Sequence, residues 1–198
     1  MPLIRRPSPP SEPSAATPAS LTEGTSDQRW AAVRAAAAQP GSIALLAAAL
    51  TQERDPRVLE AIFTGLARAG TAESATAVVP FIRSEDASLR AAALDALRAM
   101  PEASRPHVAR LLADPDADVR LLSCELARGM PESEANRLLS DLLVRETEKN
   151  VAAAAVEVLA EIGRPEALPA LTRCAERFAD DSFLAFSIKV ATDRIGSP

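Results

Sequence analysis

Two stretches of the sequence determine the predicted fold. Residues 86–101 read DASLRAAALDALRAMP and residues 114–131 read DPDADVRLLSCELARGMP. Each begins with an aspartate that suits the start of a helix, and each continues with a bulky residue, Leu89 or Val119, that is followed by arginine. Each stops at a proline, which cannot continue a helix. The two stretches therefore predict two copies of one helix.

The same helix recurs along the rest of the chain. Aligning the sequence on the bulky residue that opens the helix gives six anchors, spaced by 28 to 33 residues: Trp30, Val58, Leu89, Val119, Val151 and Leu184. Eleven or twelve residues after each anchor comes a glycine, which supplies a left-handed helix end, or a proline: Gly41, Gly70, Pro101, Pro131, Gly163 and Gly196. Five shorter segments between these helices have apolar residues at helical spacing: 42–52, 71–84, 104–113, 133–146 and 165–178.

The repeating unit is thus a helical hairpin of about 31 residues. One such hairpin cannot cover its own apolar face, so neighbouring hairpins must stack and share a core. Aromatic residues make up only 3% of the chain, which disfavours an all-β fold. The sequence predicts an all-α protein, a right-handed α-solenoid of about five helical hairpins plus a terminal helix, over residues 25–198.

The first 24 residues differ from this repeat. They hold six of the 16 prolines and few large apolar residues, so they cannot offset the entropy of ordering. We predict a disordered tail over residues 1–24. The segment Leu3-Ile4-Arg5-Arg6 is either the adhesive end of a docking tether or, as is more common, part of a solvated leader.

Charge and hydropathy restrict the partners. The formal net charge is −5, so the chain has no overall attraction to nucleic acid or to an anionic membrane surface. The longest uncharged stretch after the tail, residues 35–52, contains Pro40 and Gly41 and is not a membrane span. No secretion signal is recognisable, and Cys124 and Cys174 lie in apolar helical patterns that suit reduced thiols. A cytoplasmic protein is predicted.

The repeats resemble a known family. PDADVR at residues 115–120, DASLRAAA at 86–93 and GRPEALPAL at 163–171 are similar to HEAT repeats, in particular to the short bacterial subgroup that includes phycobilisome-lyase-like repeats. That family contains scaffolds, adaptors, bilin lyases and base-excision enzymes, and its Val-Arg helix usually lines the concave face. Here arginine follows the anchor only at Arg90 and Arg120, so the resemblance implies a stiffening Asp/Arg ladder only in the middle repeats.

A second resemblance concerns the start of the chain. The opening PLIRRP, joined to such an array, is similar to small proteobacterial HEAT proteins found beside chemotaxis-type signalling genes. It implies a role in a bacterial signalling complex.

Few side chains suggest catalysis. His107 has no partners at metal-ligand spacing, so no metal and no cofactor are predicted. The acid pairs Glu85-Asp86 and Asp180-Asp181 lie at helix starts, where capping explains them. The protein is therefore predicted to be non-enzymatic. The alternative is a lyase-type or DNA-glycosylase-type enzyme, which would need a deep pocket with perturbed carboxylates.

The function that remains is binding of a partner protein on the concave inner wall of the solenoid. Positions six and nine after the anchors point away from the apolar stripe, and they form an alternating charge ladder, whose ion pairs could equally satisfy one another on a solvated face. In the terminal helix, Phe183 and Phe186 cannot both face the core, so this helix either caps the stack or lets the chain self-assemble as a homo-oligomer. The predicted partner-binding residues are Arg68, Arg90, Asp95, Arg98, Arg120, Glu125, Arg128, Glu157, Phe183 and Phe186.

Overall fold

The structure is a computed structural model, and it describes residues 18–196. All regular elements within these residues are helical, which confirms the all-α class. The chain divides into two compact units, one ending at Gly65 and one beginning at Leu66, and each is described by itself.

Unit 1 contains the first hairpin. It comprises α1 (Pro18–Thr22), α2 (Ser26–Ala37), α3 (Ile43–Gln52) and most of α4 (Pro56–Ala69). Thr25 caps α2 and forms a capping box with Gln28, as the sequence predicts. The predicted tail, residues 1–24, lies mainly outside the described residues. Its last part is helix α1, which packs on α2 and α3 and buries Leu21.

Unit 2 contains the remaining repeats. After the end of α4 it consists of α5 (Ala72–Val78), η1 (Val79–Arg83), α6 (Ala87–Arg98), α7 (Pro101–Leu111), α8 (Ala117–Leu126), η2 (Ala127–Gly129), α9 (Glu132–Arg145), α10 (Lys149–Ile162), η3 (Pro165–Ala167), α11 (Leu168–Arg177) and α12 (Ser182–Gly196). In chain order the described helices form five successive pairs, α2 with α3 through α10 with α11, followed by α12. This order confirms the predicted repeat.

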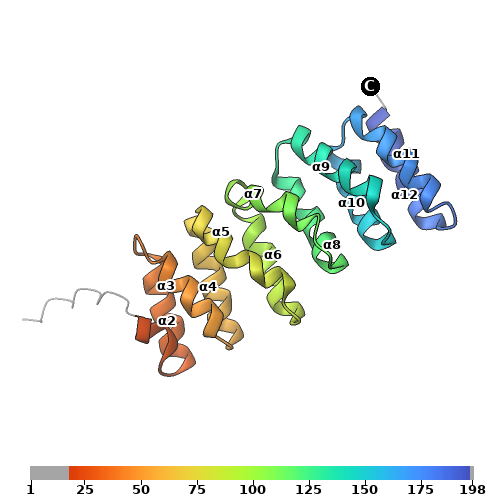
Figure 1. The fold of residues 1–198 in the computed structure, drawn as a ribbon. Helices are drawn as coiled ribbons and strands as arrows, with labels where there is room; N and C mark the ends of the chain where they lie inside the picture. Colours follow the sequence, from red (N-terminus) through yellow and green to blue (C-terminus); the bar gives the residue numbers. More distant parts are fainter. Residues whose placement is uncertain (1–17, 197–198) are drawn as a thin grey trace, which may run out of the picture. The chain divides into compact units, whose positions relative to one another are not determined.

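Helices of unit 2 form two layers (Figure 1). The anchor-bearing helices α6, α8, α10 and α12 pack on one another in sequence, and we call them the A layer. The helices α5, α7, α9 and α11 form the B layer, and each hairpin joins the two layers. Leucines fill the space between them, and the fully buried ones include Leu97, Leu111, Leu112, Leu139, Leu142 and Leu143.

Local signals set the helix starts. Asp86 accepts hydrogen bonds from the N–H groups of Ser88 (2.7 Å) and Leu89 (3.4 Å), and Asp181 accepts one from Leu184 N–H (3.0 Å). The two acid pairs of the sequence thus each supply a helix cap, which satisfies N–H groups that have no partner inside the helix.

Gly163 ends α10 for a different reason from the predicted one. Gly41 and Gly70 have positive φ angles of 81° and 60°, as expected for left-handed helix ends. Gly163 instead has a φ of −65°. A Cβ atom at this position would lie 2.6 Å from Cδ1 of Ile195 and would also collide with the carbonyl oxygen of Leu159. Glycine is needed here chiefly because the carbonyl oxygen of Leu159, in the last turn of α10, occupies the space of a Cβ, and the side chain of Ile195 from α12 narrows that space further.

We expect Gly163→Ala to lower the free energy of unfolding by about 1–3 kcal/mol, the usual cost of overpacking. Gly196→Ala is the matched control, because a Cβ there meets no atom within 4 Å. It should change stability by less than about 0.5 kcal/mol. Urea unfolding followed by circular dichroism measures both. Equal effects of the two substitutions would contradict the close packing of α12 on Gly163.

Candidate functional site

Two bidentate ion pairs with buried carboxylates hold loops that lead into the next helix. In unit 1, Arg29 donates to both carboxylate oxygens of Glu53, with Nε to Oε2 at 2.7 Å and Nη2 to Oε1 at 3.0 Å. Glu53 Oε1 also accepts the N–H groups of Arg54 and Asp55, both at 2.8 Å. The hydrogen bond from Arg29 is the main cause that lowers the pKa of Glu53 to about 2. We call this arrangement a loop clamp.

The second loop clamp lies in unit 2. Arg120 donates to Glu146, with Nε to Oε2 at 2.8 Å and Nη2 to Oε1 at 2.9 Å. Glu146 Oε1 accepts the N–H groups of Thr147 (3.0 Å) and Glu148 (2.9 Å). Burial raises the pKa of Glu146, but the hydrogen bonds from Arg120 and the loop outweigh it and leave the pKa below its usual value.

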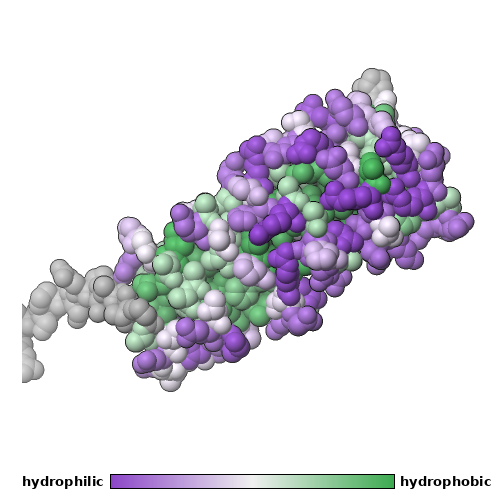
Figure 2. All heavy atoms as spheres, viewed as in Figure 1, coloured by the Kyte–Doolittle hydropathy of each residue, from purple (hydrophilic) through white to green (hydrophobic). Residues whose placement is uncertain are grey.

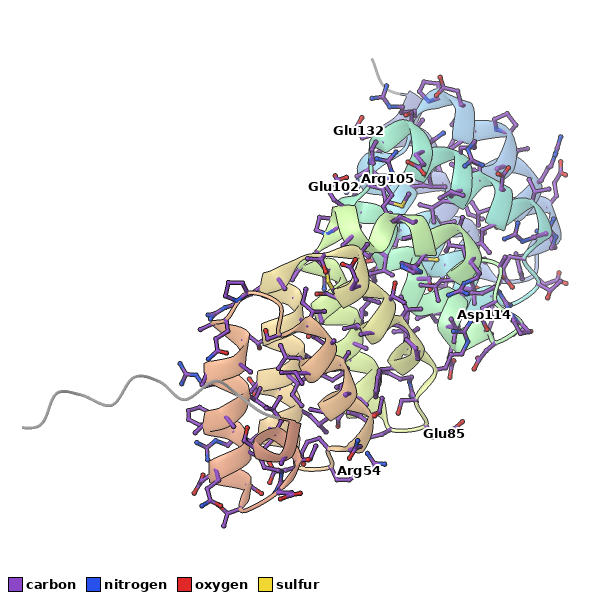
Figure 3. The ribbon with its side chains drawn as sticks, turned by 60° about the vertical axis from the view of Figure 1, so that its left-hand side comes forward. Arg54, Glu85, Glu102, Arg105, Asp114 and Glu132 are labelled. Carbon is purple, nitrogen blue, oxygen red and sulfur yellow. The ribbon has the colours of Figure 1, made fainter. Side chains whose placement is uncertain are left out.

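Arg90 and Arg120 also bind the loops before their own helices. Arg90 Nη1 donates to the carbonyl oxygens of Ser84 (2.7 Å) and Glu85 (3.1 Å). Arg120 Nη1 donates in the same way to the carbonyl of Asp114 (2.8 Å). Figure 3 labels Glu85 and Asp114 at these loops. Both arginines, which the sequence predicted to bind a partner, are therefore engaged by the loops of the fold itself.

Arg29 is the residue of this set that the sequence reasoning missed. It donates to the carbonyl of Gly24 at 2.8 Å, as Arg90 and Arg120 do to their loops. Alignment on the bulky anchor put Ala31 in this position, because the arginine precedes Trp30 instead of following it. A motif of two acidic residues separated by one residue occurs in both clamped loops, at Glu53-Arg-Asp55 and Glu146-Thr-Glu148. This motif could have indicated the loop clamps.

An acidic cluster lies on the A layer. Arg128 in η2 pairs with Glu125 of α8 (3.0 Å) and with Glu157 of α10 (3.6 Å), and it also contacts Glu161. We call these four residues the acidic cluster, which has three carboxylates and one guanidinium. The side chains of Glu157 and Glu161 are 70% and 50% exposed, so these carboxylates remain accessible.

The structure brings only part of the predicted charge ladder together. The sequence predicted the ladder as Asp95, Arg98, Glu125 and Arg128; in the structure Glu125 and Arg128 meet Glu157 of the next repeat. Asp95 and Arg98 pair with each other within α6 at 3.9 Å. Arg68 lies exposed in the last turn of α4, outside the acidic cluster. Glu161 joins the cluster although the sequence reasoning did not select it.

An apolar groove adjoins the acidic cluster between α10 and α12. It has a volume of about 250 Å³ and its lining shares Glu157 with the cluster. Phe183 and Phe186 lie on its α12 side and are 71% and 65% exposed. Its remaining lining consists of Ala153, Val156, Ala160, Ser187 and Val190. The two exposed phenylalanines thus belong to one hollow, which we call the groove.

Hydrophilic side chains dominate the visible surface over α8 to α11, whereas apolar colour gathers over α3 of unit 1 (Figure 2). On the B layer, Arg105 of α7 pairs with Glu134 of α9 at 2.7 Å, and it lies near Glu102 in Figure 3. A polar hollow of about 480 Å³ between α9 and η3 has Asn136, Arg137 and Arg164 in its lining.

The environments of Cys124, Cys174 and His107 do not favour nucleophilic or metal-binding roles. Burial raises the pKa of the Cys124 thiol to about 12, and burial also raises the pKa of Cys174. Burial and the neighbouring Arg110 lower the pKa of His107. Within residues 18–196, no three His, Cys, Asp or Glu side chains are grouped so as to hold a metal ion.

None of the described helices combines the length and the apolar character that crossing a membrane requires.

Comparison with known proteins gives a family match and structural likeness. A family model described as HEAT repeats matches residues 43–125 and 104–183. None of the curated proteins matches the chain. One similar structure, described as the structural basis of microtubule plus-end tracking by XMAP215, CLIP-170 and EB1, has a TM-score of 0.60 and 13% identity, and the match covers 89% of this chain and 88% of the other.

Two further structures are similar over nearly their whole length. A designed armadillo repeat protein has 15% identity and a TM-score of 0.45, with 90% of this chain and 98% of the other covered. The complex of CpcE and CpcF of phycocyanin lyase from Nostoc sp. PCC7120 has 15% identity and a TM-score of 0.40, with 98% and 100% covered. At these identities the likeness concerns the fold alone.

Proposed function

Since the chain belongs to the HEAT-repeat family, we propose that it is a non-enzymatic scaffold or adaptor that binds a partner protein on the A layer of unit 2. Stacked helical repeats present extended surfaces of this kind to other proteins. Within the solenoid that the repeat predicts, the A layer forms the concave wall. The single observation that carries the proposal is the acidic cluster, with accessible carboxylates beside an apolar groove.

The charges of the A layer indicate the chemistry of the partner. Glu125, Glu157 and Glu161 share one arginine, so the cluster keeps an excess of negative charge. A partner with basic side chains would be steered to this surface and held in register on it. Asp95 of α6 is 77% exposed and places a further carboxylate on the layer, beside Arg98 at 3.9 Å.

A binding role is favoured over catalysis because of how the carboxylates are placed. The two loop-clamp carboxylates, Glu53 and Glu146, have lowered pKa values and are held by arginine and backbone N–H groups. A general acid at neutral pH needs a raised pKa instead. These carboxylates therefore suit structural roles. The resemblance to HEAT proteins beside chemotaxis-type genes makes signalling proteins the first partners to test.

Charge reversal on the A layer tests the proposal. In affinity capture from native lysate with quantitative mass spectrometry, we expect Asp95→Arg with Glu125→Arg to reduce recovery of the partner at least about tenfold, as for the loss of contacts worth about 1.4 kcal/mol. The matched control reverses two exposed acids of the B layer, Glu102→Arg with Asp141→Arg. A partner list that is unchanged by the A-layer variant, or equally reduced by both variants, would refute the proposed surface.

A further inference from the structure

We propose that the groove between α10 and α12 binds the N-terminal segment of a second copy of this chain, with Leu3 and Ile4 as apolar contacts and Arg5 and Arg6 as the charged ones. This inference is independent of the proposed function, because the segment can occupy the groove whether or not another protein binds the acidic surface. The segment would cover Phe183 and Phe186, the large aromatic side chains that are exposed among the described residues.

The lining of the groove is mostly apolar and partly exposed, so an apolar ligand would bind there favourably. Phe183 and Phe186 are three residues apart on α12, so both face the same side of the helix. Their exposure of 71% and 65% leaves most of two aromatic rings in water, and covering such surface is favourable. Val156, Ala160 and Val190 continue the apolar wall between them and α10.

The groove is acidic at the end that adjoins the acidic cluster, so a basic group on the ligand would be favourable there. Glu157 belongs to its lining and Glu161 follows one turn later on α10. Their common partner, Arg128, is also bound to Glu125, so one guanidinium serves three carboxylates. A ligand that carries arginine next to an aliphatic side chain would satisfy both requirements, because guanidinium groups pair well with carboxylates.

The N-terminal segment has this chemistry. Residues 1–17 contain their two branched aliphatic residues, Leu3 and Ile4, directly before their two basic residues, Arg5 and Arg6. Pro2 and Pro7 flank them, and a proline disfavours helical backbone in the residue before it. An extended segment points alternate side chains to the same side, about 6.6 Å apart. Leu3 with Arg5, or Ile4 with Arg6, would in that conformation present one aliphatic and one basic side chain to the groove together.

A symmetric dimer through α12 fits the same surface less well. In a twofold interface the same patch from each copy is brought together. That would place the Glu157 and Glu161 carboxylates of both copies near one another, and like charges across an interface are unfavourable. The charge of the acidic cluster thus favours the basic N-terminal segment over a second α12.

Peptide binding tests this inference on the full chain. The probe is a fluorescein-labelled synthetic peptide of residues 1–10, MPLIRRPSPP, measured by fluorescence anisotropy. The receptor is the full chain with Leu3→Asp and Ile4→Asp, in which the chain's own segment cannot compete. We expect saturable binding, at least tenfold weaker binding after adding Phe186→Asp, and a similar loss after adding Glu157→Lys. The control is Val144→Asp, since Val144 of α9 is another exposed apolar residue, outside the groove. It should leave the affinity unchanged.

Other outcomes would overturn the inference. These are no saturable binding, equal binding of a scrambled peptide, or equal loss with Val144→Asp and Phe186→Asp. Light scattering provides a separate arm. A dimer that Phe186→Asp abolishes but Leu3→Asp with Ile4→Asp leaves intact would show that a second α12 is the occupant. The two proposals can fail separately. If the peptide did not bind the receptor with an intact groove, while partner capture still depended on Asp95 and Glu125, the inference would be refuted and the proposed function would stand.

Discussion

Replacing Leu97 with alanine should lower the free energy of unfolding by about 2–5 kcal/mol. Leu97 is fully buried in the last turn of α6, a helix that contacts α5, α7 and α8. Alanine at this position loses the transfer free energy of the leucine side chain and leaves a cavity between repeats, which the surrounding helices cannot fill. Urea unfolding monitored by far-ultraviolet circular dichroism measures the change.

The adjacent residue provides the matched control. Arg98 lies in the same turn of α6, but its side chain is 51% exposed and its ion pair with Asp95, at 3.9 Å, is within the helix. Arg98→Ala should therefore change stability by less than about 0.5 kcal/mol. If Leu97→Ala had an equally small effect, the helix register that buries Leu97 would be wrong.

The second large effect is expected from the loop clamp of unit 1. Glu53→Gln keeps the shape of the side chain but removes its charge, so the hydrogen bonds from Arg29 and the loop lose a charged acceptor. We expect a loss of about 1.5–3 kcal/mol at neutral pH, as for hydrogen bonds to charged groups. Trp30 is the one tryptophan of the chain and lies in α2, so its fluorescence reports unfolding of this unit.

The pH dependence of that loss has a defined direction. The pKa of Glu53 is about 2 in the folded protein against an ordinary value of 4.5. Because the unfolded chain binds the proton more readily, the contribution of Glu53 is complete above pH 4.5 and disappears as the pH falls towards 2. Wild type and Glu53→Gln should therefore converge in stability over this interval. A constant difference down to pH 2 would contradict the clamp. The control at neutral pH is Glu60→Gln, at an exposed position of α4, which should change stability by less than about 0.5 kcal/mol.

The repeat could be predicted from the sequence because its signals are local. Capping residues such as Thr25 and Asp86 and helix ends such as Gly70 act within one turn, so they are visible in a single chain. Pro101 was predicted to end one helix, and the structure shows that it also begins α7, because the first helical position tolerates the missing N–H. At Gly163 the space of a Cβ is taken by the carbonyl oxygen of Leu159 and by Ile195 of α12, and neither contact follows from the left-handed helix end that the sequence predicted.

The candidate site could be predicted only in part. Arg128 and Glu157 occupy positions nine and six after their anchors, which the alignment placed on the same face of the anchor helices, but their pairing was not predicted. The engagement of Arg120 with Glu146 was not evident, because the length and direction of a long side chain decide whether it reaches a loop or the solvent. The groove likewise depends on how α12 packs against α10. The sequence indicated its exposed phenylalanines but not the hollow beside them.

Hydroxyl-radical footprinting of the complex between the full chain and the captured partner locates the bound surface, because it reads the protection of individual side chains. We expect protection to gather on the A layer, on side chains of α6, α8 and α10, while those of α7 and α9 stay as reactive as in the free protein. Protection confined to the B layer, or to unit 1 alone, would contradict the proposed binding on the A layer.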